Sequence, residues 1–409
     1  MLSLSSEQQY VKRIYILLAA MILINPLLNK FVSNTTILRS MEILCYAGIL
    51  FYEYKLYRNH SLKSFHSYEK WLYTLLFFIS VSIIVRGNWP NSPKDFALHV
   101  LATPKYLLPF IIASLPNAKY FNHIIALFYK ISLWVIPLWI INITELVQIG
   151  TSRGESIGSL LPFISAFLLG FGGFFSKRQR MLNIIIWAVF FLLMMLNARR
   201  NVAFSLLLYA FIAYVFSIIA NMKRNIVESV LIMLISVLIG LFLVLKMDTL
   251  SSGLFKNMSN RFSEDTRSGV EELFFADFAN APITDWIFGR GMDGGYYQIM
   301  VNEETGEIDD NRTAIETGYL NMMLKGGLVY DVVIVLIMLL AIKRGYSRRN
   351  RMCLFLTTIL LTYFIDLYTT NPVCAFSVRS ILFWFCISVL FSNVPILKLP
   401  QLIRNGKRS

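Results

Sequence analysis

Long apolar runs separated by short polar connections make up most of the chain. A helix needs about 20 apolar residues to cross the hydrocarbon core of a membrane, and twelve segments approach that length. They are residues 13–32, 37–56, 71–86, 96–115, 123–143, 159–175, 182–198, 202–220, 226–246, 319–342, 352–368 and 379–396. The pattern predicts an all-α, polytopic integral membrane protein with about twelve transmembrane helices.

Basic residues cluster in alternate connections between these runs. The clusters include Lys12 and Arg13, the stretch 55–70, Lys119, the stretch 177–180, Lys223 and Arg224, the stretch 343–351, and the tail after 397. With twelve spans all of them fall on one face, as the positive-inside rule requires. We therefore expect a multi-pass membrane protein whose two termini are both cytoplasmic.

Composition agrees with this interpretation and argues against several classes of function. The 409 residues are 56% hydrophobic and only 15% charged, whereas soluble domains carry about 25% charged residues. The net charge of +14 is explained by the cytoplasmic clusters, so we expect no nucleic-acid partner. The four cysteines lack metal-type spacing, and no nucleotide-binding or zinc motif is present. We therefore expect neither a metal nor a cofactor.

One long polar segment interrupts the pattern and divides the chain. Residues 247–318 hold 14 of the 24 acidic residues and a glycine-rich turn at 289–295. Loops of this length are usually functional. The expected parts are helices one to nine in 1–246, a large outer loop with an amphipathic helix in 247–318, helices ten to twelve in 319–396, and a basic cytoplasmic tail in 397–409.

Two arginines occupy a very short connection on the expected outer face. Arg199 and Arg200 separate two apolar runs, in a place where the positive-inside rule disfavours them. Their guanidinium groups suit bidentate capture of phosphate oxygens. The alternative is that these long side chains simply reach the membrane interface.

The large loop supplies further candidates. Arg267 precedes an amphipathic stretch at 270–278, which is either part of a site or a surface helix on the membrane. Arg312 and Glu316 are four residues apart, so on a helix they would share a face and pair. Alternatively, Glu316 lies at the mouth of a membrane helix and acts as a general base. The sequence leaves both pairs of alternatives open.

Other charged residues near the outer ends of helices are weaker candidates for substrate binding. They are Arg86, Arg290, Asp366 and Arg379. Ionisable residues near membrane helices are rare and are often functional. Lys105 and Lys325 lie inside apolar runs, where interfacial extension or pairing inside the bundle explains them.

Three motifs resemble those of the superfamily of O-antigen polymerases (Wzy-type) and O-antigen ligases, which are polytopic membrane glycosyltransferases. The first is Leu-Asn-Ala-Arg-Arg at 196–200, which resembles the family's arginine-containing outer turn. The second is Arg267, followed by an amphipathic stretch and then Gly289 and Gly291. The third is Glu316-Thr-Gly-Tyr-Leu320, continuing to Gly327 and Leu328. Glu316 stands where ligases carry a histidine, which favours a polymerase.

The resemblance implies an enzyme that joins undecaprenyl-diphosphate-linked oligosaccharides at the periplasmic face, making O-antigen, capsule or exopolysaccharide. It implies Arg200, Arg267 and Glu316 as catalytic residues, with Arg199, Arg290 and Arg312 among the groups that bind substrate. Expected partners are the lipid-linked oligosaccharide, the bilayer, a flippase and a chain-length regulator. The alternatives are a ligase that transfers glycan to lipid A core and a non-enzymatic transporter of lipid-linked glycan.

Overall fold

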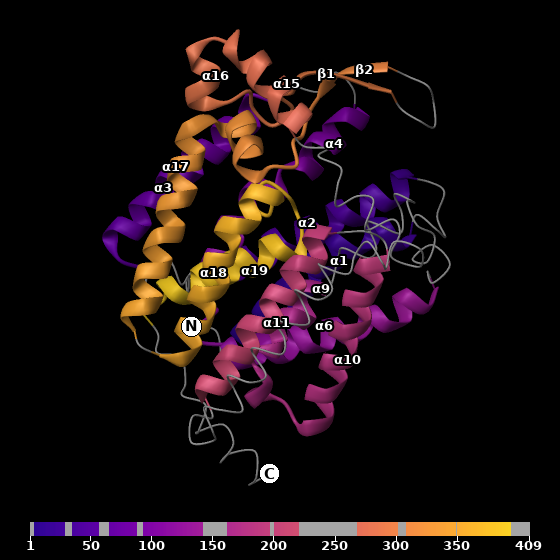
Figure 1. The fold of residues 1–409 in the computed structure, drawn as a ribbon, viewed down its shortest axis with the longest axis vertical. Coiled ribbons are helices and arrows are strands. Elements are labelled where there is room, and N and C mark those ends of the chain that lie inside the picture. Colours follow the sequence, from indigo (N-terminus) through magenta and orange to yellow (C-terminus); the bar gives the residue numbers. More distant parts are fainter. Residues whose placement is uncertain are drawn as a thin grey trace, which may run out of the picture. The chain divides into compact units, whose positions relative to one another are not determined.

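The computed structural model shows an all-α protein with one two-stranded hairpin (Figure 1). It describes residues 4–28, 35–56, 65–87, 93–141, 162–196, 200–220, 268–301, 308–348 and 350–393. Each expected membrane segment that falls within these ranges contains helix, whereas segment 226–246 lies outside them. The all-α prediction is therefore confirmed.

Two compact units divide the chain. The first combines residues up to Ile124 with Thr266–Ile396, and the second contains the described residues that begin at Ile125. The described residues of the expected loop region 247–318 belong to the first unit, together with the helix that follows them.

The N-terminal part of the first unit contains five helices. They are α1 (Leu4–Leu28), α2 (Thr35–Leu56), α3 (Ser67–Val85), α4 (Pro93–Ala102) and α5 (Pro104–Ser114). The expected continuous segment 96–115 is therefore two helices. The division falls at Thr103, because Pro104 has no N–H to continue the hydrogen bonds of α4 and suits the first turn of a new helix.

This unit also contains α17 (Gly318–Ser347), α18 (Arg351–Thr369) and α19 (Val378–Phe391). Figure 1 shows α3 and α17 side by side, and they are antiparallel. Near the start of α3, Glu69 forms an ion pair with Arg344 near the end of α17. At the other end, Arg86 after α3 donates to the Gly289 carbonyl.

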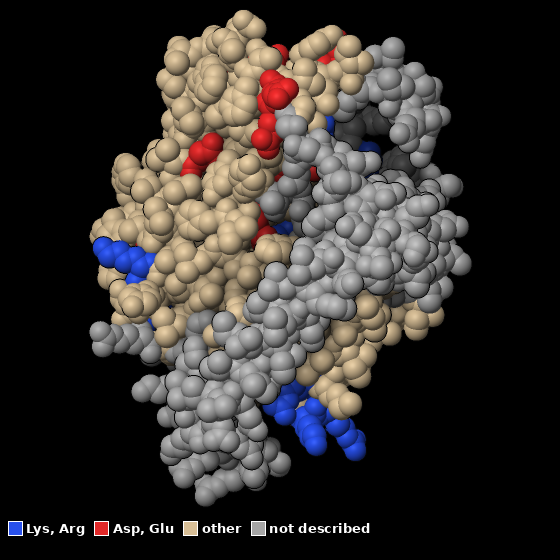
Figure 2. Space-filling view, in the orientation of Figure 1, with Lys and Arg blue, Asp and Glu red and all other residues tan. Residues whose placement is uncertain are grey.

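The two ends of the first unit differ in character. One end, which we call the loop end, carries α15 (Ser268–Ala279), α16 (Ile283–Phe288), β1 (Tyr296–Val301) and β2 (Ile308–Arg312). Acidic side chains are visible near α15 and the hairpin in Figure 2. The other end, the basic end, includes Arg344 and Arg348, which bond to Asn393 and to the Ser392 carbonyl.

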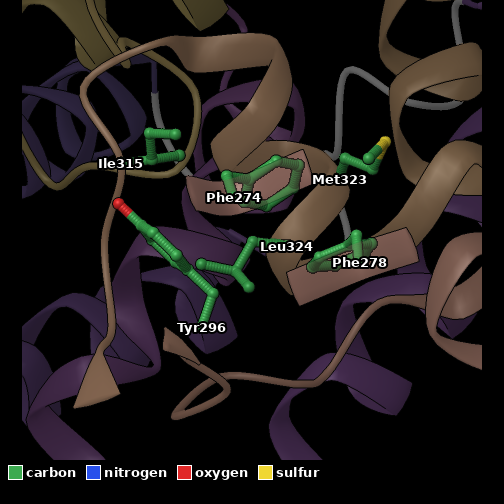
Figure 3. Close-up of a cluster of buried hydrophobic side chains, with 6 residues drawn as sticks. All are labelled: Phe274, Phe278, Tyr296, Ile315, Met323 and Leu324. Carbon is green, nitrogen blue, oxygen red and sulfur yellow. The ribbon is translucent and has the colours of Figure 1, made fainter. Parts of the chain in front are cut away.

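A hydrophobic cluster attaches the loop end to α17. It consists of Phe274, Phe278, Tyr296, Ile315, Met323 and Leu324 (Figure 3). The rings of Phe274 and Phe278 stack at 4.4 Å, and Phe274 meets Tyr296 edge to face at 5.5 Å. The amphipathic stretch is therefore a helix whose apolar face packs on the protein itself, while Leu273 and Phe275 remain exposed.

The second unit contains most of α6 (Phe121–Ile141), together with α9 (Pro162–Leu169), a short 3₁₀ helix at Gly172–Phe174, α10 (Lys177–Leu196) and α11 (Arg200–Ala220). Helix α9 packs against α10 and α11. The buried Asn183 side chain donates to the Ser165 carbonyl at 3.0 Å, and Phe163 meets Tyr209 edge to face.

Among the described helices, α3 and α17 are long and apolar enough to cross a membrane. Shorter apolar stretches occur at Val202–Val215, Met352–Tyr368 and Val378–Phe391. These helices support membrane association. The count of twelve spans and the orientation of the termini stay predictions.

Candidate active site

The loop end is organised around a break in α17. Gly327 has φ 68° and ψ −174°, a conformation essentially confined to glycine. The break leaves carbonyls of the preceding turn without helical partners. Two of them accept hydrogen bonds from the glycine-rich turn: Arg290 N donates to Leu324 O at 2.7 Å, and Gly291 N donates to Lys325 O at 3.0 Å.

The contact between this turn and α17 is close enough to require glycine on both sides. A Cβ on Gly289 would lie 2.5 Å from the Lys325 carbonyl carbon, and one on Gly327 would lie 2.2 Å from the Ile287 carbonyl oxygen. Two motifs that are separate in sequence, the glycine-rich turn and the start of the membrane helix, therefore form one structural feature.

Arg86 fixes the same turn from the opposite side. Its guanidinium donates to the Gly289 carbonyl at 2.8 Å and to the Phe288 carbonyl. The backbone of α3 adds a further bond, from Met292 N to Ile83 O at 2.9 Å. Although Arg86 was a candidate for substrate binding, its contacts place it as a clamp between α3 and the turn.

Arg290, the candidate within the turn, is held by several groups of the loop end. It forms ion pairs with Asp277 and Asp285, the latter at 2.9 Å. It also donates to the Gly295 carbonyl at 2.7 Å and lies over the Phe278 ring at 4.6 Å. These contacts give Arg290 a role in joining α15, α16 and the turn.

Glu316 is exposed and lies two residues before the start of α17. The next residue, Thr317, is the N-cap of α17, and its hydroxyl donates to Glu271 of α15 at 2.6 Å. Of the two alternatives for Arg312 and Glu316, a shared helical face is excluded, because Arg312 ends β2 and the residues between are not helical. Arg312 instead donates to the Gln298 side chain and the Ala314 carbonyl, each at 3.0 Å.

The Tyr296 hydroxyl lies within electrostatic reach of both charges. Burial raises the pKa of Tyr296, Glu316 raises it further, and Arg312 opposes this by lowering it. The hydroxyl donates to Gln298 at 3.0 Å. Tyr296, Arg312 and Glu316 therefore form one polar group at the mouth of α17.

Asp366 and Arg379 form a buried ion pair, with Nη2 and Oδ2 2.6 Å apart. Arg379 also donates to the Thr370 hydroxyl at 2.9 Å. The pair lies near the loop end, because Tyr319 in the first turn of α17 donates to the Phe364 carbonyl of α18 at 3.3 Å. These two candidates compensate each other and join the end of α18 to the start of α19.

The described residues do not place three further candidates relative to Glu316. Arg199 and Arg267 lie outside the described residues. Arg200 is the first residue of α11, in the second unit. Convergence of these arginines on Glu316 therefore stays a prediction.

A polar group that the sequence did not single out lies beside the glycine-rich turn. Lys325 is buried and donates to the carbonyls of Met292 and Gly294 at 2.9 and 2.8 Å. Asp293, in the turn, lies 3.7 Å from His99 of α4. The sequence signal was a lysine directly before two glycines inside an apolar run, a pattern that fits a broken or a continuous helix.

Among the described residues, no group of three histidine, cysteine or acidic side chains is arranged to hold a metal ion. All four cysteines are free thiols.

Comparison with known proteins finds no protein-family model that matches the chain and no curated protein that matches it. The resemblance to the O-antigen polymerases and ligases therefore depends on the three sequence motifs.

Proposed function

We propose that the chain is a polytopic glycosyltransferase of a bacterial inner membrane that joins undecaprenyl-diphosphate-linked repeat units at the periplasmic face. About twelve spans and cytoplasmic termini follow from the pattern of apolar runs and basic connections. Two observations support the proposal at different levels: the three motifs suggest the family, and the loop end suggests where its chemistry takes place.

The observation that carries the proposal is the position of Glu316. Its carboxylate is exposed, directly before the first turn of a membrane-length helix, with Arg312 and the Tyr296 hydroxyl in electrostatic reach. Thr317 and Glu271 fix the backbone on which it stands. A general base needs both access to substrate and a defined position, and Glu316 has both.

In the proposed reaction, an acceptor hydroxyl oxygen attacks the anomeric carbon of the donor glycan. The bond from that carbon to the diphosphate oxygen breaks, and the diphosphate leaves with the bonding electron pair. Glu316 takes the proton of the acceptor hydroxyl. Arg199, Arg200 and Arg267 stabilise the charge that develops on the diphosphate. As the resemblance implies, the anomeric configuration is inverted.

The direct test uses purified protein with a lipid-linked repeat unit, and the product lengths are resolved by electrophoresis. Replacing Glu316 with Gln should slow polymer formation by about 10²–10⁴-fold, as expected for loss of a general base. Replacing Arg267 or Arg200 with Ala should slow it by about 10²–10³-fold. Arg200→Lys should also impair it, since an ammonium lacks the planar fork of a guanidinium.

The matched control is Glu272→Gln, which removes an exposed carboxylate from α15 and should leave the rate unchanged. Normal rates in the Glu316, Arg267 and Arg200 variants would overturn the proposed mechanism. In cells, loss of a polymerase leaves single repeats, whereas loss of a ligase leaves long polymer unattached to lipid A core. Transport in vesicles without bond formation would favour the transporter.

A further inference from the structure

A second polar group lies beneath the glycine-rich turn, where α5, α17 and the segment after α18 come together. Tyr106 and Tyr330 are both completely buried, and they interact electrostatically with each other and with Cys374. Lys105, next to Tyr106 in the chain, also interacts with Cys374. We call Lys105, Tyr106 and Tyr330 the inner donor group.

Two hydroxyls of this group have no oxygen or nitrogen partner among the described residues. Among the described residues, no atom meets hydrogen-bond geometry with the hydroxyl of Tyr106 or of Tyr330. The Tyr330 hydroxyl does lie near the Cys374 thiol, which is a weak acceptor. Since buried polar groups are nearly always paired, two such hydroxyls in one place indicate a ligand or ordered water.

Lys325 and Lys105, the two lysines near these hydroxyls, differ in their hydrogen bonding. The Lys325 ammonium donates to the carbonyls of Met292 and Gly294. The Lys105 ammonium lies 5.0 Å from the centre of the Tyr106 ring, and within the described ranges no hydrogen bond or ion pair to it is found. Lys325 interacts electrostatically with Lys105 and with Asp293 of the turn. Two ammonium groups therefore lie near one carboxylate.

The unmet groups are mainly donors: one ammonium and two phenol hydroxyls. One acceptor is also unmet, because Oδ1 of Asp331, beside Tyr330, has no partner among the described residues. A ligand rich in acceptor oxygens would satisfy both hydroxyls, and the Lys105 and Lys325 ammonium groups favour one that carries negative charge; a phosphate group meets both conditions.

We propose that Lys105, Tyr106 and Tyr330 bind a phosphate group of an acidic ligand. The site deepens the proposed function and rests on it for one point only, namely that the phosphate belongs to the lipid-linked glycan. Soluble phosphate and phospholipid headgroups offer the same chemistry. None of the three motifs includes Lys105, Tyr106 or Tyr330 as a site residue.

The test measures binding to the full-length purified protein in detergent. The probes are undecaprenyl diphosphate, inorganic diphosphate and phosphatidylglycerol, and the readouts are native mass spectrometry and the ligand-induced rise in unfolding temperature. Lys105→Met should weaken undecaprenyl diphosphate binding at least tenfold, and Tyr106→Phe and Tyr330→Phe should each weaken it several-fold. Lys343→Met removes an exposed lysine near the basic end of α17 and should change nothing.

The tyrosine variants keep the test independent of folding. Each removes only an unpaired hydroxyl, so the unfolding temperature without ligand should stay the same or rise, while the ligand-induced rise should shrink. A response to inorganic diphosphate that depends on Lys105 also supports the site and identifies a soluble source. Equal binding of every probe to the parent and all three variants would mean that only water occupies the group, and the proposal would be overturned.

Failure of this site and failure of the proposed function give different results. If Lys105→Met binds normally while Glu316→Gln makes no polymer, this site is overturned and the proposed function stands. If Lys105→Met loses binding while the parent protein forms no polymer from the lipid-linked repeat unit, the phosphate site is supported and the proposed function is overturned.

Discussion

Asp366 and Arg379 show how one charged pair can be assigned to structure or to catalysis. Their side chains are only 4% and 10% exposed and lie 2.6 Å apart. Removing one member of a buried pair leaves the other charge poorly compensated, at a cost of about 3–5 kcal/mol. We therefore predict that Asp366→Ala lowers the unfolding temperature in detergent markedly. The double variant Asp366→Leu with Arg379→Met should recover most of the loss. A single variant with parental stability and no activity would instead indicate direct contact with substrate.

A second prediction at this scale concerns Cys374, which lies in the connection between α18 and α19. Burial raises the pKa of its thiol to about 12. Only the thiolate reacts with maleimides, and a thiol with an ordinary pKa of about 8.5 is far more ionised at pH 8. Cys374 should react more than about a thousandfold slower than a free thiol. The rate should rise about tenfold per pH unit up to the pKa.

The measurement uses a variant that retains Cys374 and has serine at the other three cysteines. Labelling is followed by mass spectrometry between pH 7 and pH 9, with detergent-denatured protein as the control for full reactivity. Fast labelling of the folded protein at pH 7 would contradict the described burial.

The central element is the broken helix α17, and its break gives a sharp prediction. Gly327→Ala places a side chain in a conformation reserved for glycine and 2.2 Å from the Ile287 carbonyl oxygen. We expect a loss of stability of about 3 kcal/mol, together with release of the glycine-rich turn. Gly269→Ala is the matched control, because a Cβ there meets nothing within 4 Å.

Thermal unfolding in detergent measures the stability of both variants. Limited proteolysis within 286–295 reports whether the turn is released. Parental stability and parental cleavage in Gly327→Ala would show that the turn and the helix are not held together by this contact.

The same helix illustrates what the sequence could reveal. The apolar runs located the helices because length and hydrophobicity alone decide them. The break at Gly327 was not predicted, since two glycines inside an apolar run look the same whether the helix continues or not. The division at Thr103 was visible in principle, because Pro104 follows it, but the run of apolar residues hid it.

The site was less predictable than the fold, because it depends on contacts between distant segments. Arg290 was a candidate for substrate binding, and nothing in the sequence indicated that Asp277 and Asp285 engage it. For Arg312 and Glu316 one alternative required a helix, whereas a strand ends at Arg312. Residues that fill a tertiary role, such as Arg86, carry no local signal that separates them from residues that bind substrate.

On the scale of the whole molecule, the two ends of the first unit carry different chemical groups among the described residues. The glycine-rich turn, Glu316 and the hairpin occupy the loop end, and Arg344 and Arg348 occupy the basic end. The antiparallel α3 and α17 connect these ends, and among the described helices they are the two that are both long and apolar enough to span a bilayer. Positive charge is retained on the cytoplasmic side, so the loop end is expected to face the periplasm.

This orientation can be tested with two single cysteines at opposite ends of the unit, in a background where Cys45 is replaced by serine. Tyr297→Cys is exposed on the hairpin and Lys343→Cys is exposed near the end of α17. A membrane-impermeant maleimide should label Tyr297→Cys when only the outer membrane is opened, and Lys343→Cys only after the inner membrane is also permeabilised. The parent with Cys45 replaced should stay unlabelled, since its other cysteines are buried. If both sites label from the same side, α3 and α17 do not cross the membrane, and Glu316 has no periplasmic substrate to meet.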